Sequence, residues 1–281
     1  MLLLLMLLAL VVMVSINVPI GIALAIAAVL GIVATDGLSA LVLIALDMYG
    51  GAKSFSLIAI PMFVLAGAIM NATGITQRLI AFVSALIGFV RGGLALVNVG
   101  VSLFFAEISG SAVADVAAMG SIMIPEMKKR GYPAPFAAAI TSSSASLAII
   151  IPPSIPMILY AVSAGTSVEQ LFVAGIVPGL IGAGGLMGVA YYMARRFDLQ
   201  DEEVFNLTRL RRTFVEALPT FALPVIILGG IFGGYVTATE GAGVAVVAAI
   251  LVGAWYGEVD WRQLKQAMLE GGIQTAVVII L

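Results

Sequence analysis

The sequence contains no cysteine and no histidine, and only 10% of its 281 residues are charged. These absences exclude disulfides, thiolate zinc sites, cysteine nucleophiles and histidine acid–base chemistry. The net charge of -2 is too small to indicate binding of nucleic acid or a polybasic lipid-binding tail. A redox or hydrolytic membrane enzyme is therefore disfavoured, and transport becomes the leading class of function.

Hydrophobic residues make up 62% of the chain, against about 45–50% in ordinary soluble domains. A soluble globule could not bury this much apolar surface, so we expect an all-α integral membrane protein, a polytopic helical bundle. Residues 1–14 are almost wholly apolar but lack both preceding basic residues and a small-x-small cleavage site. This pattern indicates an uncleaved first membrane segment rather than a signal peptide.

A membrane-spanning helix needs about 20 apolar residues. Apolar runs of this length or shorter occupy residues 2–16, 18–34, 56–70, 135–163, 168–194, 214–233, 236–256 and 271–281. Cytoplasmic loops collect Lys and Arg, which assigns 128–130 and 196–213 to the cytoplasm, and 164–167 and the N-terminus to the outside. The connections at 35–55 and 234–239 are then external as well. Residues 74–88 are amphipathic and predict a helix lying along the membrane interface.

Residues 92–130 form a segment with positive charge at both ends, so it leaves and returns on one side of the membrane. Its first arm, 92–106, would be only about 23 Å long as a helix, short of a hydrocarbon core of about 30 Å. We therefore predict a re-entrant hairpin whose tip is Ser109-Gly110-Ser111. Hydroxyls and freed carbonyls at such a tip suit Na+, although a polar turn that only satisfies its own backbone explains the triplet equally well.

Two carboxylates, Glu107 and Asp115, flank this tip. Ionisable side chains inside a membrane are costly, and a functional role is the default hypothesis for them. For Glu107 the alternative is equally strong: it pairs with a hydroxyl or faces a watery vestibule.

The segment 135–163 contains a serine-rich stretch, residues 141–146, followed by Ile151-Pro152-Pro153-Ser154-Ile155-Pro156. The prolines remove backbone donors and cannot continue a regular helix. Irregular backbone at membrane depth usually lines a site, which predicts a broken helix beside a cavity or a partner. The serines are also explained by close helix packing, and the prolines by a structural kink.

The order of elements indicates two inverted repeats. Residues 1–195 would be the first repeat, 196–213 a cytoplasmic linker, and 214–281 the beginning of the second repeat, broken off in its third helix. The charged connection 257–270 would correspond to 35–55. On this interpretation we expect the chain to be incomplete and unable to transport alone.

Several motifs follow one another along nearly the whole chain. They are SLIAIPMF (56–63), LAG (65–67), SGSAVAD (109–115), KKRGY (128–132), IPPSIP (151–156) and FVAGIVPG (172–179). With them the sequence resembles the large membrane subunit of tripartite ATP-independent periplasmic (TRAP) transporters, of the C4-dicarboxylate permease type. The set is far more specific than any one motif.

The resemblance implies a sodium-coupled importer of organic acids in the lipid bilayer of the bacterial inner membrane, with no cofactor besides the coupling ion. Its partners would be a small membrane subunit and a periplasmic substrate-binding protein. It further implies an elevator in which hairpin 92–130 and broken helix 135–163 belong to the moving core. The residues that match the family's cation site are Ser109, Gly110, Ser111, Ser142, Ser143, Ser144, Ile151 and Pro152. We expect the anionic substrate to bind beside them, at Pro153 and Ser154.

Two positions depart from the family pattern. Ala148-Ile149 stand where relatives often have Gly-Pro, and Glu107 stands where many have glycine.

Two other functions are also compatible with the pattern: an elevator-type sodium/dicarboxylate symporter that needs no binding protein, and a non-transporting membrane scaffold. The ordered motifs argue against the first, and the costly intramembrane breaks argue against the second.

Overall fold

The computed structural model describes residues 1–199 and 204–280, apart from the side chains of residues 43, 47, 52, 108, 109, 263, 270, 274 and 278–280. The described residues form α-helices and two short 3₁₀ turns and contain no strand, which confirms the all-α class. The elements are α1 (Leu2–Ser15), α2 (Ile20–Asp36), η1 (Leu38–Ala40), α3 (Leu41–Ala52), η2 (Phe55–Ile58), α4 (Ala59–Ala72), α5 (Ile75–Ile87), α6 (Gly93–Ser109), α7 (Ala112–Lys129), α8 (Ala134–Ala145), α9 (Leu147–Ile150), α10 (Ile155–Ala164), α11 (Val168–Arg196), α12 (Leu207–Phe232), α13 (Ala238–Trp255) and α14 (Trp261–Ile280).

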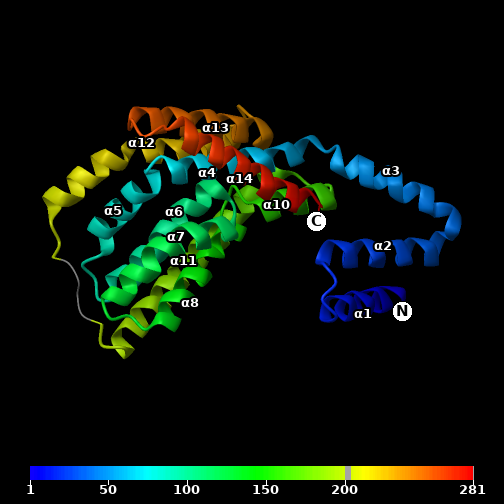
Figure 1. Cartoon of the computed structure of the whole chain (residues 1–281), viewed down its shortest axis with the longest axis horizontal. Helices are drawn as coiled ribbons and strands as arrows, with labels where there is room; N and C mark the ends of the chain where they lie inside the picture. Colours follow the sequence, from blue (N-terminus) through cyan, green and yellow to red (C-terminus); the bar gives the residue numbers. More distant parts are fainter. Residues whose placement is uncertain (200–203, 281) are drawn as a thin grey trace. The chain divides into compact units, whose positions relative to one another are not determined.

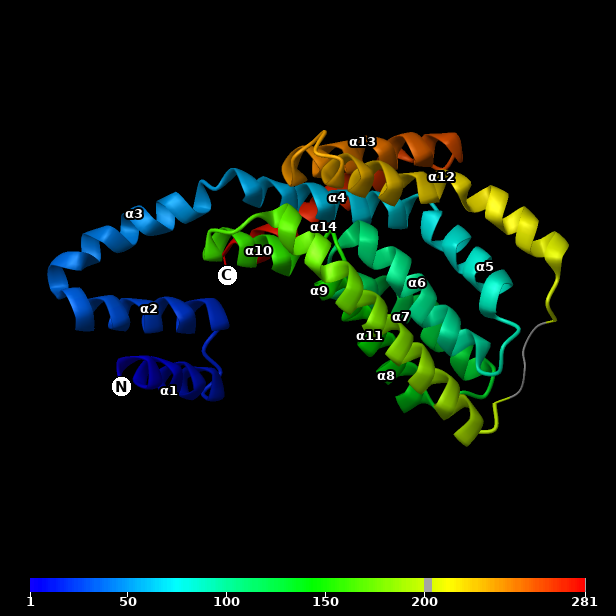
Figure 2. The same cartoon turned by 180° about the vertical axis from the view of Figure 1, so that it is seen from behind.

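The chain divides into two compact units, Met1–Ser54 with Ile273–Leu281, and Phe55–Gly272. In the first unit α1 packs against α2 (Figures 1 and 2). The chain reverses between them at Asn17, which has φ 67°. α1 has no buried residue, and leucine side chains such as Leu3 and Leu4 are each 71% exposed. An apolar helix with this exposure requires lipid or protein around it.

In the second unit the hairpin α6–α7 packs with α8, α9 and α11 around one apolar core (Figures 1 and 2). α6 lies at the centre, because it contacts α5 as well as these four helices. Large side chains such as Met119, Met123 and Met127 fill the core at 0–1% exposure. The helices that carry the tip and the break are therefore held by the same packed core.

The helices α4, α5, α12 and α13 lie along one side of this core (Figures 1 and 2). α13 packs closely on α4, because its buried face consists largely of small residues spaced three or four apart, including Ala242, Ala245, Ala249 and Gly253. A Cβ on Gly253 would lie 2.6 Å from the Thr73 side chain. Small residues of this kind allow helices in membranes to approach closely.

Within the described part of the chain, five helices or helical stretches are long and apolar enough to cross a membrane: Phe55–Ala72, Ala134–Ala164, Val168–Arg196, Leu207–Phe232 and Ala238–Trp255. The runs expected at 56–70, 135–163, 168–194, 214–233 and 236–256 are confirmed as helical. The hairpin and the helix at 74–88 are also present, the latter as α5. Re-entry of the hairpin on one side of the membrane and the inverted repeats stay predictions.

Three predicted connections are more helical than expected. Most of 35–55 is η1 and α3, and residues 207–213 of the predicted linker already belong to α12, which Asn206 caps through a hydrogen bond from the Arg209 amide. α14 begins at Trp261 and passes through Gly271-Gly272, so the charged connection does not extend to 270. A search for apolar runs finds the apolar part of a helix. It misses a helix end whose side chains are polar and whose free backbone amides are hydrogen-bonded by a capping residue.

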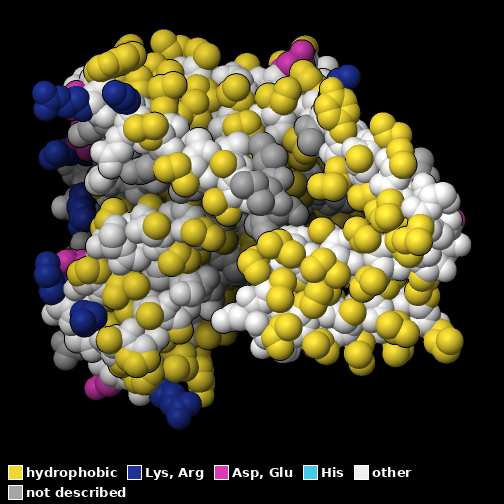
Figure 3. Space-filling view, turned by 45° about the vertical axis from the view of Figure 1, so that its right-hand side comes forward, with side chains coloured by type: hydrophobic (Ala, Val, Ile, Leu, Met, Phe, Trp, Pro, Cys, Tyr) yellow, Lys and Arg dark blue, Asp and Glu magenta, His cyan; other side chains and the backbone are white. Residues whose placement is uncertain are grey.

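Lys and Arg side chains gather along one edge of the second unit (Figure 3). Basic residues stand in the last turns of both α7 and α11, and Arg91 precedes α6. The start of α6 and the end of α11 meet, because the Arg91 guanidinium forms an ion pair with Asp198 and its Nε donates to the carbonyl of Leu199 at 3.0 Å. Gathering of this kind is what the positive-inside rule requires of a cytoplasmic face.

Candidate functional site

The hairpin tip is a tight turn between α6 and α7. Gly110 follows α6 with φ 58°, in the left-handed region that favours glycine. Ser111 is extended and caps α7, since its hydroxyl accepts a hydrogen bond from the amide of Ala114 at 3.3 Å. The side chain of Ser109, a predicted sodium ligand, lies outside the described residues.

The second interruption separates α9 from α10. Ile151 is extended, and two prolines that cannot donate backbone hydrogen bonds follow it. The hydroxyl of Ser154 donates to the carbonyl of Ile149 at 2.6 Å and accepts from the amide of Met157 at 3.4 Å, which ends one helix and begins the next. Residues 151–155 are all buried. Protein therefore encloses this irregular backbone, which is the condition for irregular backbone at membrane depth.

The tip and the break are in contact. The amide of Ile155 donates to the carbonyl of Gly110 at 3.2 Å, and a Cβ on Gly110 would lie only 2.5 Å from the carbonyl oxygen of Pro153. The tip and the break, whose residues the family resemblance assigns to one cation site, therefore lie side by side. Since α7 begins after Ser111 and α10 begins at Ile155, two helix N-termini, each with a partial positive charge, converge there as well.

The predicted serines of α8 face different ways. Ser144 is buried, and its hydroxyl accepts a hydrogen bond from Ser102 of α6 at 3.2 Å. Ser142 and Ser143 are exposed, and the hydroxyl of Ser142 donates to the carbonyl of Ala138 at 2.9 Å. Because successive helical residues are about 100° apart, only Ser144 of the three lies on the inner face of α8.

Polar residues that the motifs did not single out join this inner face. The amide of Asn98 on α6 donates to the hydroxyl of Thr141 at 2.6 Å, one turn before the Ser102–Ser144 pair. All four side chains are 0% exposed. A signal for them exists in the sequence, because Asn98 and Ser102 are four apart, on one face of a mostly apolar helix.

Asp115 on α7 is 0% exposed, and among the described residues neither of its carboxylate oxygens has a hydrogen-bond partner. Asn98 Oδ1 is likewise buried without a partner in the described part of the chain. Glu107 is partly exposed and lies near the end of α6. Of the two carboxylates that lie close to the tip in the sequence, Asp115 is therefore enclosed inside the hairpin, whereas Glu107 lies partly at its surface.

Residues 7–281 match the family model described as the DctM component of the tripartite ATP-independent periplasmic transporter. The chain belongs to this family. It is 39% identical over 240 residues to the 2,3-diketo-L-gulonate TRAP transporter large permease protein of Escherichia coli, covering 85% of this chain and 56% of the relative. It is 40% identical over 239 residues to the C4-dicarboxylate TRAP transporter large permease protein of Pseudomonas aeruginosa, covering 85% and 56%.

A third relative, the sialic acid TRAP transporter large permease protein of Vibrio cholerae, is 35% identical over 236 residues, covering 84% of this chain and 55% of the relative. The chain thus spans about half the length of the curated relatives it matches. These relatives are transporter permeases rather than enzymes. Membership of this family, together with the long apolar helices, shows that this TRAP permease chain is a multi-pass membrane protein.

Outside the tip and the break, a charged clamp ties α5 of the TRAP permease chain to the loop after α13. Arg78 makes two hydrogen bonds to Glu258, at 2.7 and 3.1 Å, and its guanidinium lies 3.8 Å from the ring centroid of Tyr256. The Tyr256 hydroxyl donates to the carbonyl of Glu216 in α12 at 2.7 Å. The bonded guanidinium holds the pKa of Glu258 below its ordinary value.

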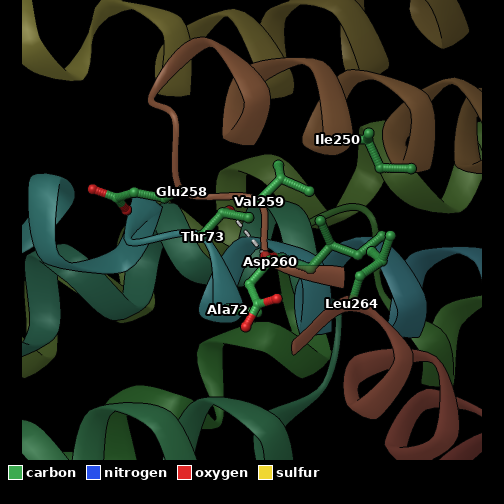
Figure 4. A pocket seen from close by; sticks show the side chains of 8 residues that line it. Ala72, Thr73, Ile250, Glu258, Val259, Asp260 and Leu264 are labelled. Carbon is green, nitrogen blue, oxygen red and sulfur yellow. Dashed lines mark hydrogen bonds between the residues drawn. The ribbon is translucent and has the colours of Figure 1, made fainter. Parts of the chain in front are cut away.

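A small cavity lies beside this clamp (Figure 4). It is lined by Ile69, Ala72, Thr73, Ile250, Glu258, Val259, Asp260 and Leu264. Its volume of about 10 Å³ suffices for about one water molecule. This cavity is therefore too small for an organic acid.

Proposed function

We propose that this chain is part of the permease of a sodium-coupled TRAP transporter that imports an organic acid across the bacterial inner membrane. The observation that carries the proposal is the contact between Gly110 and Ile155. It joins two helix interruptions, each of which would be costly in lipid without a function beside it. Discontinuous helices that meet near the middle of a membrane are typical of ion and substrate sites in secondary transporters.

The sodium ligands of this proposal are those predicted from the sequence. Carbonyls at Gly110, Ile151 and Pro152 and hydroxyls of Ser109, Ser111 and Ser144 are the oxygen donors that a hard cation prefers. Ser142 and Ser143 would contribute only if α8 turned relative to α6, because both are exposed in this structure.

An anionic substrate is supported by the two helix N-termini at the same point. The N-termini of α7 and α10 carry partial positive charge, and Pro153 and Ser154 stand directly before α10. The names of the relatives refer to 2,3-diketo-L-gulonate, C4-dicarboxylates and sialic acid. We infer a C4-dicarboxylate or related carboxylate as substrate, delivered by a periplasmic binding protein, with a small membrane subunit as the second partner.

Uptake into proteoliposomes tests this function. The full-length transporter, containing this chain and its small subunit, would be reconstituted with an external binding protein and a radiolabelled carboxylate. We expect uptake only with both an inward sodium gradient and the binding protein. Uptake that needs no binding protein would favour the binding-protein-independent symporter, and absence of uptake for a panel of carboxylates would favour the scaffold.

A further inference from the structure

The motif FVAGIVPG at 172–179 lies on α11, the long helix that follows the broken helix. Its two glycines, Gly175 and Gly179, are both buried, and they lie on one face of α11 because they are four residues apart. α11 packs against α9 and α10, the helices on either side of the break. The motif therefore adjoins the break, although neither glycine belongs to the break or to the tip.

Gly175 lies against the end of α9. A Cβ on Gly175 would be 2.3 Å from the carbonyl oxygen of Ile150 and 2.5 Å from Cε of Met157 on α10. The end of a methionine side chain can move aside, whereas the carbonyl is part of the main chain. It belongs to the last carbonyls of a helix, which have no partner within that helix. Only a residue without a side chain lets this carbonyl approach α11 so closely.

Gly179 makes room for the first residue of the break. A Cβ on Gly179 would lie 2.5 Å from Cγ1 of Ile151 and 3.7 Å from its Cβ. Ile151 has an extended backbone and is 4% exposed, so its side chain is enclosed. The carbonyl that ends α9 and the side chain that opens the break are therefore both directed at α11.

The other end of the break contacts the hairpin tip. A Cβ on Gly110 would be 2.5 Å from the carbonyl oxygen of Pro153, and the Ile155 amide donates to the Gly110 carbonyl at 3.2 Å. Between the two ends stand Pro152 and Pro153, whose rings fix the backbone angle φ. Because this connection is stiff, an orientation imposed at Ile151 carries over to the carbonyl that meets the tip.

We propose that Gly175 and Gly179 are positioning residues of the TRAP permease. They form a seat on α11 that sets the direction of the backbone from Ile150 to Pro153, and with it the fit of the break to the tip. Neither glycine has a side chain that could bind an ion or a substrate, so both act through the break. The consequence for sodium rests on the proposed function, whereas the seat itself rests on the packing.

Amide hydrogen exchange measures the fit of the break to the tip. The full-length transporter in detergent would be followed by mass spectrometry of a peptide that contains the Ile155 amide. We expect Gly175→Ala and Gly179→Ala each to speed exchange of this amide by about tenfold, because a displaced break lets the bond to the tip open more often. Gly184→Ala, on the same helix, is the matched control and should exchange like the wild type. In the described part of the chain nothing lies within 4 Å of a Cβ on Gly184.

A second substitution distinguishes the two glycines. Ile151→Ala removes the atom that lies 2.5 Å from an added Cβ on Gly179. The double variant of Gly179→Ala with Ile151→Ala should therefore exchange more slowly than Gly179→Ala alone, and Ile151→Ala by itself completes the cycle. The same change should not restore Gly175→Ala, since the obstacle there is the backbone of Ile150. A general loss of helix packing would not be relieved by Ile151→Ala in either case.

Sodium-driven uptake measures the consequence for transport. In proteoliposomes with the binding protein, Gly175→Ala should raise the sodium concentration needed for half-maximal uptake several-fold. The reason is that displaced carbonyls fit a small ion less well. Gly184→Ala should leave this concentration unchanged.

Unchanged exchange at Ile155 in both Gly175→Ala and Gly179→Ala would overturn the seat, and so would an equal effect of Gly184→Ala. Faster exchange with an unchanged sodium dependence would overturn the positioning role. If Gly175→Ala does not accumulate, Gly179→Ala and its relief by Ile151→Ala decide the question. A wild-type transporter without sodium-driven uptake would instead contradict the proposed function, and hydrogen exchange would then decide the seat by itself.

Discussion

The carbonyl of Gly110 accepts a hydrogen bond at 3.2 Å from the amide of Ile155, a residue that lies far away in the sequence. One partner ends a helix and the other begins a helix. The bond therefore gives each interruption part of the hydrogen bonding that its own helix cannot supply. This mutual satisfaction explains how two breaks persist in one apolar core, and it makes the contact between them sensitive to small changes.

Gly110→Ala should destabilise the contact between tip and break. Gly110 has φ 58°, and an added Cβ would lie 2.5 Å from the Pro153 carbonyl oxygen, a backbone atom that cannot rotate away. A non-glycine residue in this conformation costs about 1–3 kcal/mol before the clash is counted. Thermal unfolding of the purified transporter measures the loss.

Gly131→Ala is the matched control for this change. Gly131 has φ 84°, but nothing lies within 4 Å of an added Cβ. It should therefore show the conformational cost without the clash, and a smaller fall in melting temperature than Gly110→Ala. Equal falls in the two variants would contradict the close approach at Pro153.

Ser111→Ala should raise the sodium concentration needed for half-maximal uptake by the complete transporter, and Ser109→Ala should do the same. The reason is the loss of an oxygen donor at the proposed site. Ser111→Ala also removes a helix cap worth about 0.5–2 kcal/mol, so expression and assembly must be checked by size-exclusion chromatography. An unchanged sodium dependence in both variants would remove the tip from the ion site.

The clamp between Arg78 and Glu258 should make stability sensitive to acid. Because the pKa of Glu258 is lowered in the folded protein, its contribution is fully present above the ordinary glutamate pKa of about 4.3. It is lost as the pH falls through the lower folded value. The pair is partly exposed, so we expect at most about 1 kcal/mol.

Glu258→Gln tests the clamp by melting at a series of pH values below 5. The variant should lose part of the wild type's fall in stability with acid, because it has no carboxylate to protonate. Glu169→Gln, at an exposed glutamate in the first turn of α11, is the control and should melt like the wild type. A wild-type acid response in Glu258→Gln would show that Arg78 does not depend on this carboxylate.

Single cysteines test the membrane orientation, because the chain has none of its own. A cysteine at Thr166, between α10 and α11, should react with an impermeant thiol reagent added outside intact cells. A cysteine at Asn206, before α12, should react only after the membrane is opened. The opposite pattern would invert the topology.

The sequence alone predicted the helices that are long and apolar, since a bilayer demands an uninterrupted run of hydrophobic side chains and the composition records it. It also located both interruptions, at 109–111 and 151–154, because glycine and proline act on the backbone locally. The helical connections were missed for the corresponding reason. The first turns of α12 and α14 contain polar residues, and the start of α12 is stabilised by the Asn206 cap rather than by an apolar run. α3 does contain an apolar stretch, LVLIAL at 41–46, but that stretch is too short to cross a membrane.

What only the tertiary structure decided is which polar atoms face one another. Three serines in a row are equivalent in the sequence, but α8 turns Ser144 toward α6 and leaves Ser142 and Ser143 outside. Asp115 is close to the tip in sequence, but the antiparallel packing of the hairpin encloses it in the core. Such pairings depend on the rotation and register of helices distant in sequence, and these follow from the packing of side chains against one another.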